Sequence, residues 1–284
     1  MSGAAEGAPA SPPREPLREL VQQELAYVAT KIPFSERVRR FLDGMGSTTV
    51  LFGRALSRGV RPPYAPREIA YQVEVLGVRS LSIATLTAVF AGLVISLQFA
   101  FFLARFGVQH TVGKVVVLTL FRELGPVLTA LTVGARIGSG IAAELGSMTV
   151  TEQVDAIRAL GADPIRKLVV PRLFACSLVL PALTTLADVF GLLAGSLVVW
   201  AEYELPLREF YRSVLETANL MDFGSGIAKS AVFGAIIGIV GCHQGFNVSG
   251  GTEGVGRATT ETVAIASVAV CLSDFFLTKL FMAL

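Results

Sequence analysis

The hydrophobic pattern of this chain contains five long apolar stretches. The first, residues 80–104, carries no charged side chain, and as a helix it is long enough to cross the roughly 30 Å hydrocarbon core of a membrane. Four more follow, at about residues 113–143, 168–200, 223–246 and 259–284. This pattern predicts an all-α polytopic membrane protein with about five transmembrane helices.

The residues before the first apolar stretch show two other patterns. Residues 1–16 are small, polar and rich in proline, a composition typical of disordered segments. In residues 17–66, apolar positions recur at helical intervals with arginines between them, which predicts an amphipathic region on the membrane surface. Residues 67–284 form the predicted membrane domain.

The distribution of basic residues predicts an orientation in the membrane. Lysine and arginine collect before the first apolar stretch and between the second and third, whereas residues 202–222 contain more acidic than basic side chains. Because basic loops usually stay in the cytoplasm, we expect a cytoplasmic N-terminus. Five spans would then place residues 149–161 in the cytoplasm, and residues 202–222 and the C-terminus outside.

Composition agrees with a membrane protein and argues against several kinds of site. Hydrophobic residues make up 52% of the chain and charged residues only 16%, which is too apolar for an ordinary soluble domain. Cys176, Cys242 and Cys271 lie in apolar runs without the spacing of a metal site or a disulfide framework. We expect no metal, no cofactor and no nucleic-acid partner.

A short amphipathic segment separates the second and third apolar stretches. Its apolar face contains Val154, Ile157, Leu160 and Gly161. Its charged face contains Glu152, Asp155 and Arg158. A helix with one packed face and one polar face between two spans is expected to offer its polar face to a soluble partner.

Charged side chains also occur inside the second apolar stretch, as Arg122, Glu123 and Arg136. Ionisable groups at membrane depth are costly, so they usually face the interior of a bundle or a cavity and mark a transport path. Arg122 and Glu123 are adjacent and point about 100° apart on a helix, so they cannot both pair within one face. We expect at least one of them to face a cavity or a neighbouring helix.

Glycines spaced four residues apart recur in the apolar stretches, and such pairs let helices approach closely in a membrane. The pairs are Gly134 with Gly138, Gly191 with Gly195, Gly234 with Gly238, and Gly241 with Gly245. The sequence leaves open which pairs serve the fold of one chain and which serve a homodimer.

Residues 120–172, LFRELGPVLTALTVGARIGSGIAAELGSMTVTEQVDAIRALGADPIRKLVVPR, closely resemble the signature region of MlaE/YrbE-type permeases. These permeases are the membrane subunits of MCE-associated ABC lipid transporters. The resemblance continues through SLQF at 96–99, GRATT at 256–260 and LSDFFLT at 272–278. It covers the chain from about residue 67 to the C-terminus.

The resemblance implies a function and assigns residues to it. The chain would be a non-catalytic permease subunit in the inner membrane, working as a homodimer with a cytoplasmic ATPase and an MCE-domain protein to move a phospholipid or similar lipid. Residues implied to couple to the ATPase are Glu152, Asp155, Ile157, Arg158 and Gly161. Residues implied to line a lipid pocket are Val94, Leu97, Gln98, Phe102, Arg122, Glu123 and Leu124, with Arg257 as a gate or as one half of an ion pair.

Other interpretations have weaker support in the sequence. Residues 251–258 imitate a phosphate-binding loop but have Arg257 and Ala258 where such loops carry lysine and serine or threonine, so we expect no ATP binding in this chain. A secondary carrier would use Glu123, Asp188 or Asp274 as proton sites. An intramembrane hydrolase would need Asp188 and Asp274 as a catalytic pair. Which lipid moves, and in which direction, is not encoded in a recognisable motif.

Overall fold

The computed structural model describes residues 34–59 and 66–283, and all regular structure within those ranges is helical. The chain divides into two units, residues 1–47 and 48–284. The first unit contributes only the start of helix α2 (Phe34–Gly59) to the described residues. The predicted disordered tail, residues 1–16, and part of the predicted amphipathic region, residues 17–33 and 60–65, lie outside the described residues.

Five helical segments of the second unit are long and apolar enough to cross a membrane, which confirms the predicted fold class. The spans are Leu81–Arg105, Gln109–Val150, Ile165–Tyr203, Leu220–Phe246 and Gly251–Ala283. The corresponding helices are α4 (Leu81–Arg105), α5 (Val112–Thr119) with α6 (Gly125–Val150), α8 (Val170–Tyr203), α10 (Leu220–Phe246) and α11 (Gly251–Ala283). The second and third spans also contain short segments, η1 (Gln109–Thr111), η2 (Leu120–Leu124) and η3 (Ile165–Val169).

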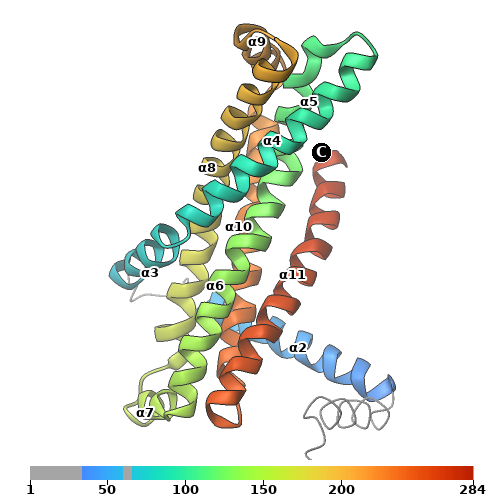
Figure 1. Ribbon diagram of the computed structural model, residues 1–284. Coiled ribbons are helices and arrows are strands. Elements are labelled where there is room, and N and C mark those ends of the chain that lie inside the picture. Colours follow the sequence, from blue (N-terminus) through green and yellow to red (C-terminus); the bar gives the residue numbers. More distant parts are fainter. Residues whose placement is uncertain (1–33, 60–65, 284) are drawn as a thin grey trace, which may run out of the picture. The chain divides into compact units, whose positions relative to one another are not determined.

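Three shorter helices connect or flank the spans: α3 (Pro66–Val78), α7 (Gln153–Ala159) and α9 (Leu207–Thr217). Helices α7 and α9 lie at opposite ends of the bundle formed by the spans, as five alternating spans require (Figure 1). The predicted fourth and fifth spans leave a connection at residues 247–258, which is shorter in the structure because α11 already begins at Gly251. Its glycine-rich composition is typical of a loop, but most of this segment is helical.

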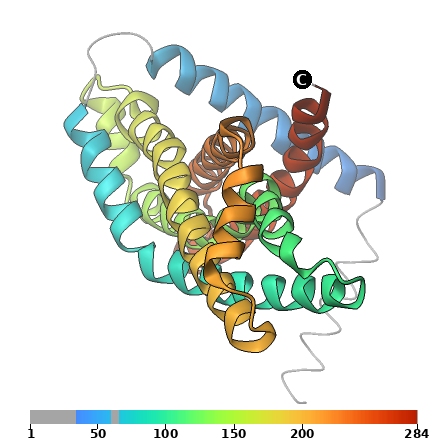
Figure 2. The ribbon, with the colours of Figure 1, turned by 90° about the horizontal axis from the view of Figure 1, so that it is seen from above.

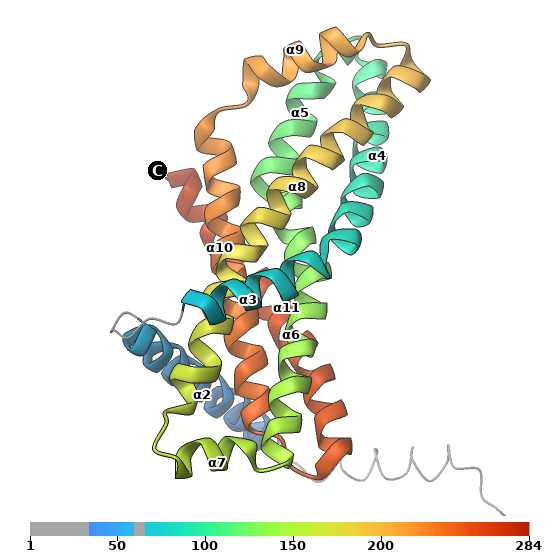
Figure 3. The same ribbon diagram turned by 90° about the vertical axis from the view of Figure 1, so that its left-hand side faces the viewer.

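Helices α6, α8 and α10 form the centre of the bundle, while α4 packs on α8 and α11 packs on α6 and α10. The view from above shows this arrangement (Figure 2), and a side view shows α3 crossing beside α8 (Figure 3). In the most apolar part of each span, 56% of the residues of α10 are buried, against 22% for α4 and 11% for α11. Large parts of α4 and α11 are therefore uncovered within one chain.

The predicted glycine pairs all face neighbouring helices of the same chain. A Cβ atom on Gly234 would overlap the backbone carbonyl of Cys176, and one on Gly241 would lie 2.9 Å from the carbonyl oxygen of Gly138. Gly191 and Gly195 pack against α4: a Cβ atom on Gly191 would lie 3.2 Å from the carbonyl oxygen of Ala88, and one on Gly195 would overlap the hydroxyl of Ser96. Gly92 on α4 has no room for a Cβ atom either, because it faces the backbone of Gly191. These glycines therefore hold one chain together, which answers the question that the sequence left open.

Helix α9 is fastened to the second span by apolar and ionic contacts. Phe210 and Val214 are buried against α5, where Gly113 has no room for a side chain. Glu216 accepts a hydrogen bond from Arg212 and forms an ion pair with Lys114, whose Nζ atom lies 3.3 Å away. The hydrogen bond from Arg212 is the main cause that holds the pKa of Glu216 below its usual value, and the nearby Lys114 lowers it further.

We predict that Gly234→Ala destabilises the protein by about 1–3 kcal/mol, because the new methyl group meets rigid backbone of α8. Gly224→Ala on the same helix is the matched control, since no described residue has an atom within 4 Å of its added Cβ. Alanine favours helix over glycine there by up to about 1 kcal/mol. Thermal unfolding of both variants in detergent measures the difference, and equal melting temperatures would contradict this account of the packing.

Candidate functional site

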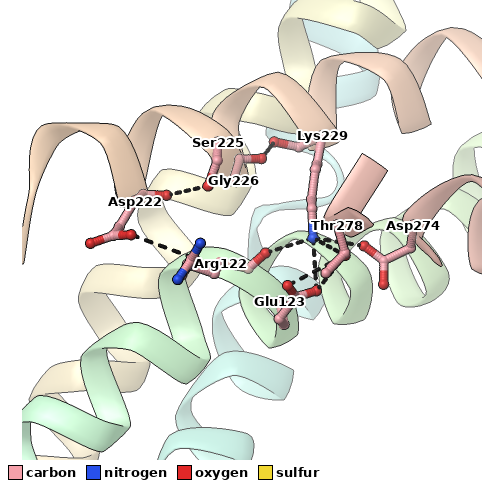
Figure 4. A network of polar contacts seen from close by, with 9 residues as sticks. Arg122, Glu123, Asp222, Ser225, Gly226, Lys229, Asp274 and Thr278 are labelled. Atoms are coloured by element: carbon pink, nitrogen blue, oxygen red, sulfur yellow. Dashed lines mark hydrogen bonds and ion pairs between the residues drawn. The ribbon is translucent and has the colours of Figure 1, made fainter. Parts of the chain in front are cut away.

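A buried lysine joins three of the spans. Lys229 lies within α10 and is 1% exposed. Its Nζ atom lies 2.7 Å from Glu123 Oε2, 2.6 Å from Thr278 Oγ1 and 3.1 Å from Asp274 Oδ1 (Figure 4). It also donates to the backbone carbonyl of Arg122 at 3.0 Å. A single ammonium group thus connects the second, fourth and fifth spans.

The η2 segment that carries Arg122 and Glu123 is one turn of π-helix inside the second span. Such turns are rare within α-helices and are frequent at functional sites. Arg122 Nε lies 3.4 Å from Asp222 Oδ1, while Glu123 reaches Lys229. Asp222 and Lys229 are two helical turns apart on α10, so both adjacent charges of η2 pair with the same neighbouring helix. At least one of the two was expected to face a cavity or a neighbouring helix, and both face a neighbouring helix.

The network of Figure 4 contains two cationic and three acidic side chains. The side chain of Lys229 is only 2% exposed, against 37% for Glu123 and 21% for Asp274. A buried charge is costly without partners, so both carboxylates and Thr278 are needed to stabilise the ammonium. Sequence reasoning missed Lys229. A lone lysine inside an otherwise apolar span was the signal that could have identified it.

The remaining charges inside the spans have separate surroundings. Arg136 Nη1 donates to Ser80 Oγ at 2.9 Å, and Arg172 Nη2 donates to Glu144 Oε1 at 2.7 Å. Asp188 is 2% exposed and packs against Gly125, and its Oδ1 has no hydrogen-bond donor among the described residues. Asp274 is instead bound to Lys229, so the two aspartates expected for a hydrolase occupy different environments.

The predicted lipid-lining residues of α4 lie on an exposed face of that helix. Val94, Leu97 and Phe102 are 53%, 41% and 56% exposed, and Gln98 is exposed beside them. Further apolar side chains extend the same uncovered surface along α4, including Ile83, Leu86, Phe90 and Phe101. Helix α11 has a comparable exposed surface formed by Val268, Leu272, Phe275 and Phe276.

The other predicted lipid-lining residues belong to the η2 turn. Arg122 and Glu123 take part in the ionic network, and Leu124 lines a small cavity together with Leu120 and Asp188. The predicted set is therefore divided between the outer face of α4 and the η2 turn, rather than gathered around one cavity in one chain.

Helix α7 has a buried anchor and an exposed polar side. Val154 is 4% exposed and Ile157 packs against the same apolar core, while Asp155 and Arg158 form an exposed ion pair of 2.9 Å. The prediction that Leu160 shares the packed face is wrong, because Leu160 follows the last helical turn and is 86% exposed.

Both ends of α7 have left-handed backbone. Gly161 has a φ of 76° and Glu152 a φ of 58°. Gly161 N–H donates to the Arg158 carbonyl at 2.9 Å, and the next N–H, of Ala162, donates to the Ile157 carbonyl at 3.1 Å. This pair of bonds is a Schellman motif, which favours glycine at the left-handed position. Gly161 therefore has a structural role in ending α7.

Arg257 lies in the first turns of α11, where its side chain is exposed. No salt bridge involves it among residues 34–59 and 66–283, so the ion-pair interpretation finds no partner within the described part of one chain.

We predict that Lys229→Met destabilises the protein by about 3–5 kcal/mol, because it leaves Glu123 and Asp274 without their counter-ion. Lys279→Met, an exposed lysine on α11, is the matched control and should change stability little. Adding Glu123→Gln and Asp274→Asn to Lys229→Met should restore much of the loss. Thermal unfolding measures the stability of all three variants. A triple variant less stable than Lys229→Met would contradict the role of charge pairing.

Comparison with known proteins places this geometry in a family. The model of the permease MlaE family matches residues 69–280. A probable ABC transporter permease protein of Rickettsia felis is 38% identical over 246 residues, covering 87% of this chain and 95% of that protein. One of Synechocystis is 42% identical over 214 residues, covering 75% of this chain and 81% of that protein.

A third relative comes from a plant. The chloroplastic protein TRIGALACTOSYLDIACYLGLYCEROL 1 of Arabidopsis thaliana is 37% identical over 235 residues, which covers 83% of this chain and 67% of that protein. The family match includes the first four spans, the fifth span up to residue 280, the η2 turn, α7 and the residues around Lys229. The chain therefore belongs to the MlaE family of ABC transporter permeases.

Proposed function

We propose that this chain is the membrane subunit of a transporter that moves a phospholipid or a similar hydrophobic lipid. The uncovered face of α4 is the observation that carries this proposal. Its side chains are apolar for most of the length of the span, and Gln98 is a polar exception near the middle of the predicted pocket residues. Such a surface suits acyl chains, whereas a sugar or an amino acid requires many hydrogen-bonding groups.

The comparison with the plant relative supports the same class of substrate. That protein is named after trigalactosyldiacylglycerol, a glycolipid. A lipid with two acyl chains needs an apolar path and a limited number of polar contacts for its headgroup. The η2 turn, where Arg122 and Glu123 interrupt the apolar surface of the second span, provides polar groups beside that path.

A separate cytoplasmic ABC ATPase would drive this movement through α7. The helix is exposed, has defined ends and is anchored by Val154 in the core shared with α6, α8 and α10. A force applied to α7 would therefore reach the central spans. Leu160 gives the partner an apolar side chain to bury, next to the charged pair of Asp155 and Arg158.

Two copies of the chain would enclose the lipid between the uncovered faces of α4 and α11. The assembly would lie in the inner membrane with α7 in the cytoplasm. At the opposite end, near α9, Leu215, Leu220 and Met221 are each at least 79% exposed. These apolar side chains suit contact with an MCE-domain lipid-binding protein outside the membrane.

The lipid path is tested with a photoreactive leucine analogue at position 97 in the purified complex with the ATPase. We expect it to label a phospholipid that remains bound in detergent, and we expect ATP turnover to lower this labelling. The same analogue at position 178, an exposed site on α8, is the control and should not respond to ATP. Equal labelling and an equal response to ATP at positions 97 and 178 would indicate that the face of α4 only contacts the bilayer.

The ATPase partner is tested with Leu160→Asp. We expect the variant to lose affinity for the ATPase by about tenfold or more, because exposed apolar anchors dominate the energy of such contacts. Leu215→Asp, equally exposed at the other end of the bundle, is the matched control. Native mass spectrometry should give two permease and two ATPase chains. Lipid transfer that follows a proton gradient without any ATPase would favour a secondary carrier instead.

A further inference from the structure

A second site lies away from the η2 turn and from the face of α4. A cavity of about 370 Å³ lies between the end of α2, the start of α3 and the beginning of the third span. This volume falls within the range of ligand pockets in proteins. None of the residues that line it takes part in the network around Lys229.

The lining of this cavity is divided between charge and apolar surface. Arg58, Arg166 and Lys167 supply three cations, and Glu68 and Asp163 supply two carboxylates. Ile69, Val170 and Phe174 contribute apolar wall. A ligand that fits both parts has an anionic group joined to a hydrocarbon part.

Contacts within the cavity reduce the influence of one of the two carboxylates. Asp163 binds Arg58 Nη1 at 2.8 Å and accepts the backbone N–H of Ile165 at 3.1 Å. The contacts of Arg58 with Asp163 use Nη1, which leaves the other guanidinium donors for a ligand. Lys167 is exposed and has no ion pair among the described residues. The lining therefore contains three cationic side chains against two carboxylates.

The position of the cavity follows from the span that it borders. Residues 163–167 lie at the start of the third span, which begins at Ile165. Phe174 lies about 10 Å beyond Lys167 along the span, at 1.5 Å per residue. The cations thus lie at the end of the span, and the apolar wall extends from there toward its middle.

We propose that this cavity binds an anionic phospholipid, with its phosphate against Lys167 and Arg58 and an acyl chain along Phe174. The site is separate from the proposed transport path and holds a lipid at the base of the third span. Because Arg58 also binds Asp163 in the loop after α7, an occupied site would link the lipid composition of the membrane to the position of that loop. A free phosphate ion would find the same cations but would leave the apolar wall unused.

The test uses a tryptophan placed in the cavity. The only tryptophan of the chain is Trp200, so the double variant Phe174→Trp with Trp200→Phe reports on the cavity alone. The protein is reconstituted in vesicles that contain brominated phosphatidylglycerol or brominated phosphatidylcholine at equal fractions. We expect stronger quenching by the anionic lipid. Adding Lys167→Ala should weaken its apparent affinity about fivefold.

Two controls isolate the cavity. The unaltered protein reports through Trp200, about 39 Å away along the same helix, and should show no preference for the anionic lipid. Lys279→Ala removes an exposed lysine of α11 and should leave the quenching at position 174 unchanged. If the tryptophan variant does not fold, native mass spectrometry can count the bound lipids instead. We then expect Lys167→Ala to retain one phosphatidylglycerol fewer than the unaltered protein.

Three results would overturn the proposal. Equal quenching at position 174 by both lipids would show that the cavity does not select charge. Quenching that is unaffected by Lys167→Ala would place the selectivity elsewhere. Release of the quenching by millimolar inorganic phosphate would identify a free anion as the occupant. None of these results depends on lipid transport, so the proposed function and this site fail or succeed separately.

Discussion

The ammonium group of Lys229 needs partners that its own helix does not supply. Its neighbours along α10 are small or apolar, so the compensating charges come from Glu123 on η2 and Asp274 on α11. This requirement fixes the relative rotation of three spans, since each must direct one particular side chain to the same point. The π-helical turn at residues 120–124 serves this arrangement, because it orients two adjacent charges toward one neighbouring helix.

Around this point the bundle has two kinds of surface. Helices α6, α8 and α10 approach closely through glycines and bury most of the core. Helices α4 and α11 each contribute a packed face and leave bulky apolar side chains uncovered on the other. A central part held by close backbone contacts can stay intact while its uncovered faces meet lipid or another chain. This division suits a permease that must change shape without losing its fold.

Much of the fold could be predicted from the sequence, because membrane spans follow from the length and polarity of each segment. The five spans and the amphipathic α7 were found in this way. The start of α11 was misplaced, since glycine-rich composition does not distinguish a loop from a helix that packs closely. Leu160 was assigned to the packed face because helical spacing was continued beyond Ala159, where the helix ends just before the left-handed backbone of Gly161.

The candidate site was predicted less completely. Arg122 and Glu123 were recognised as unusual, but their partners come from helices about 100 and 150 residues further along the chain, as the spacings of 106 and 155 residues to Lys229 and Thr278 show. No local pattern specifies such pairings. Asp274 was considered as a proton site or as the partner of Asp188 in a hydrolase, whereas in the structure it forms an ion pair with Lys229. The lining of the proposed lipid path between two copies cannot be derived from one chain's periodicity either.

The buried lysine also constrains how the protein is made. When the ribosome delivers α10 to the bilayer, Lys229 at the helix centre opposes insertion by about 2.5–3.5 kcal/mol. Glu123 precedes Lys229 in the chain, whereas Asp274 follows it by 45 residues and therefore reaches the bilayer later. The nascent fourth span must therefore meet the second span first, and the last helix completes the cluster. Biogenesis thus proceeds through a half-neutralised intermediate that the final span converts into the mature bundle.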